Sequence, residues 1–117
     1  MAGCSETDAA LRSLVQAGVP LVTGTDAPVP GIAYGASMHV EIARLVAAGL
    51  SPVDALAAAT SRAAAAFRLR DRGSVRAGLR ADLLLVDGDP SLDIVATRRI
   101  VGVWKRGVAV SRTQTPP

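Results

Sequence analysis

The stretch that decides the fold reads Gly18-Val19-Pro20-Leu21-Val22-Thr23-Gly24-Thr25-Asp26-Ala27-Pro28. Residues 19–23 form a short apolar run, and a loop rich in Gly and Pro closes it. Such a run is typical of a strand that is buried on both faces. Asp26 then lies at the tip of the strand, and the carboxyl ends of parallel strands are where α/β barrels hold their chemistry. The stretch therefore predicts an α/β fold and makes Asp26 the first candidate for a functional carboxylate.

A helix is expected directly before this strand. Ser5 and Asp8 have the spacing of a capping box that opens a helix, and Gly18 stands where a C-terminal cap belongs. A helix followed at once by a strand is one repeat of a parallel α/β architecture. The loop from Thr25 to Gly35 comes next, and long loops after buried strands often carry binding and catalytic groups.

Two further helices are expected after the loop. Apolar residues at helical spacing predict one from about Ser37 to Ala48, and Gly49 ends it. The next opens with Ser51 as N-cap, Pro52 at the first helical position and Asp54 closing a capping box. We expect this helix to break near Thr60-Ser61 and to continue to about Phe67.

The pattern changes from helical to β after Leu69. Gly73-Ser74-Val75 and Ala81-Asp82-Leu83-Leu84-Leu85-Val86 predict strands, and we expect the second to be well buried. Residues 100–104 and 108–110 predict a hairpin around Lys105-Arg106-Gly107. Residues 113–117 predict a disordered tail.

Length and composition limit what this chain can be. At 117 residues and 50% hydrophobic it is large enough for one small domain, but a (β/α)₈ barrel needs about 250 residues. Aromatic residues make up only 3%, and alanine supplies much of the apolar share. A core of small side chains buries little area per residue, so we expect the isolated chain to be marginally stable.

The formal net charge is +3, and nearly all the positive charge is arginine, with Lys105 as the only lysine. The arginines are spread among acidic residues over several elements, and no basic run is interleaved with aromatic residues that could stack on bases. We therefore expect a solvated arginine-rich surface and no nucleic-acid partner. No apolar run approaches membrane-spanning length, which predicts no membrane contact.

Cys4 is the only cysteine, so an intrachain disulfide is excluded and a reducing compartment is favoured. It lies near an end that we expect to be mobile, which favours an incidental thiol over a nucleophile. The first residues lack the basic start and apolar stretch of a signal peptide. These features together predict a cytoplasmic protein.

Several segments carry a resemblance through their order and spacing: residues 17–27, 41–56, 58–60, 73–75, 78–90 and 103–107. Together they resemble the C-terminal portion of the metal-dependent amidohydrolase superfamily, close to its imidazolonepropionase- and prolidase-like members. The resemblance covers residues 10 to 112. It departs from the usual pattern at Leu79, where a lysine is common, and at Arg68, which replaces a usual glycine before Leu69.

The resemblance implies a fold and a division of the chain. Residues 1–69 would form the last strand and helices of a (β/α)₈ (TIM) barrel, and residues 70–112 would add strands to a small β-sandwich domain built from both chain ends. We therefore expect the 117-residue chain to be an incomplete fragment whose N-terminal barrel portion lies elsewhere, or a chain that associates with itself.

The resemblance also implies a role for Asp26, as the aspartate at the end of the eighth strand. In relatives this residue binds a divalent metal, usually zinc, and takes a proton from the attacking water. A bound metal lowers the pKa of its water toward 7, and a carboxylate beside it can accept the proton as the oxygen attacks a carbonyl or amidine carbon. Asp26 is thus the expected catalytic residue and metal ligand, while the substrate-binding residues stay unknown.

The chain cannot complete such a site alone. A catalytic zinc takes about three protein ligands plus water, and relatives supply most of them from earlier strands. The one histidine, His39, lies on the helix after the loop, and we favour a surface or substrate-pocket role for it over metal ligation.

Two functions from different classes remain open. The first is part of a hydrolase that acts on carbon–nitrogen, non-peptide bonds of a small-molecule amide or cyclic compound through a metal-activated water. The second is a truncated, non-catalytic structural module that associates with itself through an unpaired strand at residues 19–23 and apolar helix faces.

Overall fold

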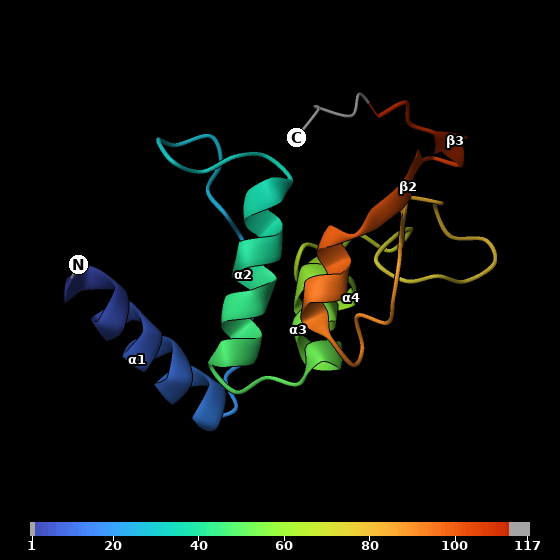
Figure 1. Cartoon of the computed structure of the whole chain (residues 1–117). Coiled ribbons are helices and arrows are strands. Elements are labelled where there is room, and N and C mark those ends of the chain that lie inside the picture. The colour runs from blue at the N-terminus through green and yellow to red at the C-terminus, as the bar shows by residue number, and fades with distance from the viewer. Residues whose placement is uncertain (1, 113–117) are drawn as a thin grey trace.

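The computed structural model describes residues 2–112, with helices in the first half and a small antiparallel sheet in the second (Figure 1). The elements in chain order are α1 (Ala2–Gln16), α2 (Ala36–Ala47), α3 (Pro52–Ala59), α4 (Ser61–Ala66), β1 (Leu83–Val86), η1 (Ile94–Arg98), β2 (Ile100–Lys105) and β3 (Val108–Ala109). α1 stands to one side in Figure 1, while α2 and α3 lie next to each other at the centre.

The core lies where α2, α3 and the short 3₁₀ helix η1 meet. Ile42 and Leu45 of α2, only 5% and 4% exposed, pack with Ala55 and Ala58 of α3 and with Ile94 of η1. The spacing of three residues on each α-helix places each pair on one face. The alanines let the helix backbones approach closely, and residues from both halves of the chain thus share one core.

The start of α3 follows from its capping residues. The Asp54 backbone N–H donates to Ser51 Oγ at 3.1 Å, and the Ser51 hydroxyl donates to Asp54 Oδ2 at 2.7 Å. Pro52 occupies the first turn, where its missing N–H costs nothing. The backbone at Thr60 (φ −131°, ψ −92°) separates α3 from α4, so the predicted cap and the predicted break are both confirmed.

The sheet has the order β1-β2-β3, with both pairs antiparallel. Lys105 pairs with Val108, and the two residues between them, Arg106 (φ 51°) and Gly107 (φ 79°), have the positive φ values of a tight hairpin turn. The predicted hairpin is confirmed. On β2, a Cβ on Gly102 would lie 2.6 Å from the Trp104 ring, so the indole lies across Gly102 on the same face.

Residues 19–23, predicted to be a buried strand, form no strand in the structure, and Val22 is 43% exposed. A parallel strand needs neighbouring strands for its hydrogen bonds. Within residues 2–112 all the strands lie after residue 82, and they form one separate antiparallel sheet. The predicted strand has no partner to pair with. Its contacts are with helices instead, as Leu21 packs against the α2–α3 core.

Three other sequence predictions are wrong in detail. Helix α1 begins at Ala2, so Ser5 lies inside it and is not its N-cap. Residues 73–75 form no strand, because Gly73 packs its backbone against α4 and Val75 is exposed. β1 forms as predicted but is not well buried: Leu84 and Leu85 are half exposed, since no second layer covers this sheet within the described residues. The predicted tail at 113–117 lies outside the described residues.

Candidate active-site loop

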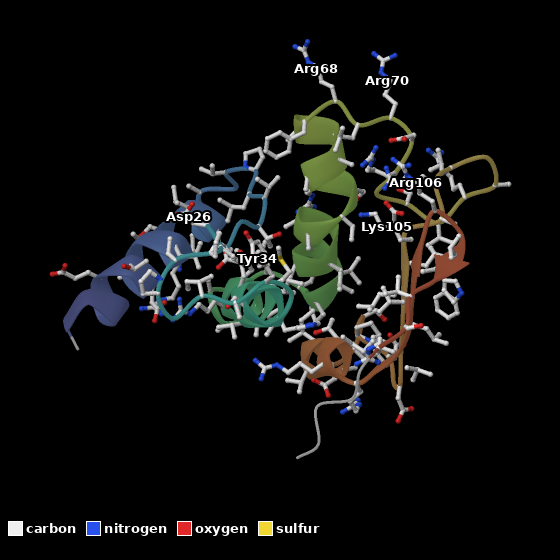
Figure 2. All side chains as sticks on the ribbon, turned by 90° about the horizontal axis from the view of Figure 1, so that it is seen from above. Asp26, Tyr34, Arg68, Arg70, Lys105 and Arg106 are labelled. Atoms are coloured by element: carbon white, nitrogen blue, oxygen red, sulfur yellow. The ribbon has the colours of Figure 1, made fainter. Side chains whose placement is uncertain are left out.

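Asp26 lies in the loop between α1 and α2, with its side chain exposed to solvent (Figure 2). Its backbone has φ of 58°, in the left-handed region. Asp enters this region more readily than most residues, but the conformation is still uncommon and tends to cluster at functional sites. Among residues 2–112 its carboxylate has no hydrogen bond or ion pair, so it is free to accept one.

Contacts with α2 and α3 position the chain that leads to Asp26. The Thr23 N–H donates to the Ala58 carbonyl of α3 at 3.2 Å. The Gly24 N–H lies 3.5 Å from Glu41 Oε1 on α2, a long hydrogen bond. After the turn, the Ala27 N–H donates to Thr25 Oγ1 at 3.3 Å. Residues on both sides of Asp26 are therefore fixed by polar contacts, while its own side chain is not.

Glu41 is a supporting residue that the sequence did not single out. It lies on α2 seventeen residues after Gly24, and its carboxylate oxygen faces the backbone that precedes Asp26. A glutamate on a helix is ordinarily a solvated surface residue, so no signal in the sequence marks this contact. Tyr34, also in the loop and 75% exposed, is the other prominent side chain (Figure 2).

His39 joins α2 to η1 and belongs to no metal-ligand cluster among residues 2–112. Its Nδ1 lies 3.1 Å from Thr97 Oγ1, and the buried Thr97 hydroxyl donates to the Ile94 carbonyl at 2.8 Å. Because that hydroxyl proton is already used, Nδ1 carries a proton and donates to Thr97. Burial, and secondarily the positive charge of Arg98, hold the pKa of His39 below its ordinary value of 6.5. Neutral His39 thus ties the two halves of the chain together.

No group of three or more His, Cys, Asp or Glu side chains that could hold a metal ion is formed within the described part of the chain. The two largest of the described surface hollows, within residues 2–112, lie away from Asp26. One of about 440 Å³ lies between α3 and β1, and one of about 420 Å³ lies beside the loop after α4. Asp26 lines neither of them.

Among residues 2–112, no helix has the length and apolar character needed to cross a membrane.

Comparison with known proteins places the chain in a family. Residues 4–110 match the model of the Amidohydrolase family. The chain belongs to the amidohydrolase family. This confirms the resemblance found in the sequence.

Imidazolonepropionase from Deinococcus deserti is 37% identical over 103 residues, which are 85% of this chain and 26% of that protein. Adenine deaminase from Lysinibacillus sphaericus is 35% identical over 75 residues, 64% of this chain and 12% of that protein. The crystal structure of a Xaa-Pro dipeptidase with bound methionine in the active site superimposes with a TM-score of 0.79 at 30% identity, over 90% of this chain and 25% of that one. This amidohydrolase chain thus spans about a quarter or less of the relatives it matches.

Proposed function

We propose that this chain contributes Asp26, as catalytic carboxylate and metal ligand, to an amidohydrolase that cleaves a carbon–nitrogen bond of a small molecule with a metal-activated water. The observation that carries the proposal is the placement of Asp26. It lies in a strained backbone conformation with an unpartnered, exposed carboxylate, in a chain that matches this family over residues 4–110. Asp also tolerates the left-handed region in ordinary turns, so the family match is what favours a functional role over a turn role.

The chemistry assigned to Asp26 is proton acceptance. A carboxylate that is free of internal partners can accept the proton of a water as that water's oxygen attacks a carbonyl or amidine carbon. The contacts of Thr23 and Gly24 with α3 and α2 would limit the movement of the backbone and so hold the carboxylate in position.

The donor set of the described residues does not fit a metal centre by itself. A catalytic zinc takes about three protein ligands, and residues 2–112 gather no such group around Asp26. We therefore propose zinc and its missing ligands only for a complete barrel. The remaining strands of that barrel would also pair with residues 19–23. The division at residue 70 into a barrel segment and a sandwich segment, and the cytoplasmic location, are part of the same proposal.

The substrate is proposed only as a class. The relatives are named for an imidazolone, a purine base and a dipeptide, and these share a carbon–nitrogen bond to be hydrolysed. A small amide or cyclic carbon–nitrogen compound is therefore the proposed substrate.

The test is Asp26→Asn in the native protein at the length that its source cell makes, assayed on a panel of cyclic amidines, N-acyl amino acids and Xaa-Pro dipeptides. Loss of a general base is expected to lower kcat by about 10²- to 10⁴-fold. Asp87→Asn is the matched control, because Asp87 is also exposed and its carboxylate has no partner among residues 2–112. Equal activity of Asp26→Asn and the wild type would refute the role of Asp26.

The non-catalytic module is the second candidate, and exposed apolar surface favours it. Leu84 and Leu85 on β1 and Val101 on β2 are about half exposed or more, and no large side chain of the described residues is fully buried. Such a surface favours association with another chain or with a second copy. Sedimentation of the native protein discriminates the two: a self-associated 11.9 kDa chain that hydrolyses nothing in the panel supports the module.

A further inference from the structure

The hollow beside the loop after α4 is rich in cationic side chains. Its volume is about 420 Å³, and no residue of the Asp26 loop lines it. Two serines and four arginines are among the residues that line it: Ser61, Ser74, Arg68, Arg70, Arg72 and Arg76. These four arginines lie within residues 68–76, on the segment that follows α4.

Most of this positive charge is not neutralised. Arg72 forms a two-pronged contact with Asp71, from Nε to Oδ1 at 2.8 Å and from a terminal nitrogen to Oδ2 at 3.2 Å. The guanidinium groups of Arg68, Arg70 and Arg76 have no ion pair or hydrogen bond within residues 2–112. All three arginines are exposed and line one hollow, so their charges together make the hollow attractive to an anion.

Arg68 adopts a backbone conformation that residues other than Gly seldom take. Its N–H donates to the Ala65 carbonyl at 3.1 Å and the Leu69 N–H to the Ala64 carbonyl at 2.8 Å, which is the pattern of a Schellman C-cap. The residue at this left-handed position (φ 57°) is usually Gly. Figure 2 shows Arg68 and Arg70 extending in the same direction from the loop.

The backbone of the hollow is held in place before any ligand arrives. A Cβ on Gly73 would lie 2.6 Å from the Ala64 Cβ, so the loop backbone lies directly against α4. The Arg80 N–H donates to the Asp71 carbonyl at 2.7 Å and closes the loop. A fixed backbone lowers the entropy lost when a ligand binds.

We propose that this hollow binds the phosphate group of a small phosphorylated molecule. Guanidinium groups match phosphate oxygens in pairs, and Ser61 and Ser74, whose hydroxyls have no partner among the described residues, can donate to the same oxygens. Phosphate is favoured over a carboxylate because it carries a charge of about −1.5 to −2 at neutral pH, which better balances three arginines. The site is independent of the function proposed for Asp26.

The test is calorimetric titration of the native protein with inorganic pyrophosphate as the probe. Saturable binding with a Kd of about 1 mM or tighter is expected. The double variant Arg70→Gln with Arg76→Gln should weaken it by about tenfold or more, because two charge-assisted contacts are lost. Arg68→Gly should also weaken pyrophosphate binding, and it should remove the backbone strain at this position. If the variant is at least as stable as the wild type, its weaker binding cannot be attributed to misfolding.

The matched control is Arg12→Gln with Arg44→Gln, which removes the same charge from residues that line a different hollow. It should bind pyrophosphate like the wild type. Equal weakening in both double variants would mean attraction by net charge alone and would overturn the proposal. A titration with pyrophosphate that does not saturate would also overturn the proposal. Steeply salt-dependent binding of duplex DNA by a chain that does not bind pyrophosphate would overturn it too.

Discussion

The Asp26 loop and the helical core differ in where their partners lie. In the core, Ile42 of α2, Ala55 of α3 and Ile94 of η1 are all buried against residues of the same chain. The segment of residues 19–35 meets the rest of the described molecule through a few contacts, among them the Thr23–Ala58 hydrogen bond and Leu21. The core residues therefore pack against partners within this chain, whereas the Asp26 carboxylate, to which we assign the chemistry, has no partner among the described residues.

This difference explains how a chain that spans 26% of a relative's length can hold a defined helical arrangement without an assembled site. Packing of α2, α3 and η1 needs only neighbours along this chain. A hydrolytic site needs groups from several strands, because ligands and acid–base groups must converge on one reacting atom.

The largest expected effect on stability is in the core. Ile42→Ala should lower the free energy of unfolding by about 2–5 kcal/mol, because it removes buried methyl groups and leaves a cavity. Val22→Ala in the loop segment, where the side chain is already half exposed, should cost less than about 1 kcal/mol. Urea unfolding followed by circular dichroism measures both. If Ile42→Ala does not fold, Ile42→Val should still cost about 0.5–1.5 kcal/mol. Equal losses at Ile42 and Val22 would show that the segment of residues 19–35 is packed as firmly as the core.

A smaller effect is expected at the start of α3. Ser51→Ala should lower stability by about 1 kcal/mol, because the Asp54 N–H at the helix N-terminus loses its acceptor. Ser51→Asp keeps an acceptor at the N-cap and should restore most of the loss. The same unfolding assay applies. A neutral Ser51→Ala would mean that packing of α3, rather than its cap, fixes where the helix begins.

The smallest effect concerns pH and the link between α2 and η1. His39 has a lowered pKa when folded, so the unfolded chain holds more protons between that value and 6.5. The contribution of neutral His39 is fully present above pH 6.5 and is lost as the pH falls from 6.5 through the lowered folded pKa. His39→Asn, which can keep a donor to Thr97 but does not titrate, should flatten the stability curve in this interval. The difference between the two curves isolates His39, and identical curves would contradict the prediction.

The sequence was informative where a structural signal is local. Ser51 and Asp54 are three residues apart, and Arg106-Gly107 is a two-residue turn, so the cap of α3 and the hairpin could both be predicted from neighbours. Residues 19–23 could not be assigned correctly in this way. Their apolar pattern is that of a strand, but a strand also needs a partner for its backbone, and the pattern cannot say whether that partner exists.

The candidate site was also predictable from the sequence only in part. The position of Asp26 at the end of an apolar segment was visible in the sequence, and its chemical role remains a proposal. The contacts around it were not visible, because Glu41 lies 17 residues from Gly24, and His39 pairs with Thr97 across 58 residues. The arginines of the hollow are close together in the sequence, at residues 68–76, but the close approach of Gly73 to Ala64 was not visible there. Spacing along a chain does not encode such distant meetings.

The indole of Trp104 across Gly102 gives this chain a built-in optical probe. Trp104 is the only tryptophan and lies on β2, while Tyr34 is the only tyrosine and lies exposed in the Asp26 loop. Tryptophan emission therefore reports on the sheet, and tyrosine absorbance reports on the loop. A small molecule that enters near Asp26 would change the tyrosine signal and leave the tryptophan spectrum as it was, so binding and unfolding can be followed separately without attaching a dye.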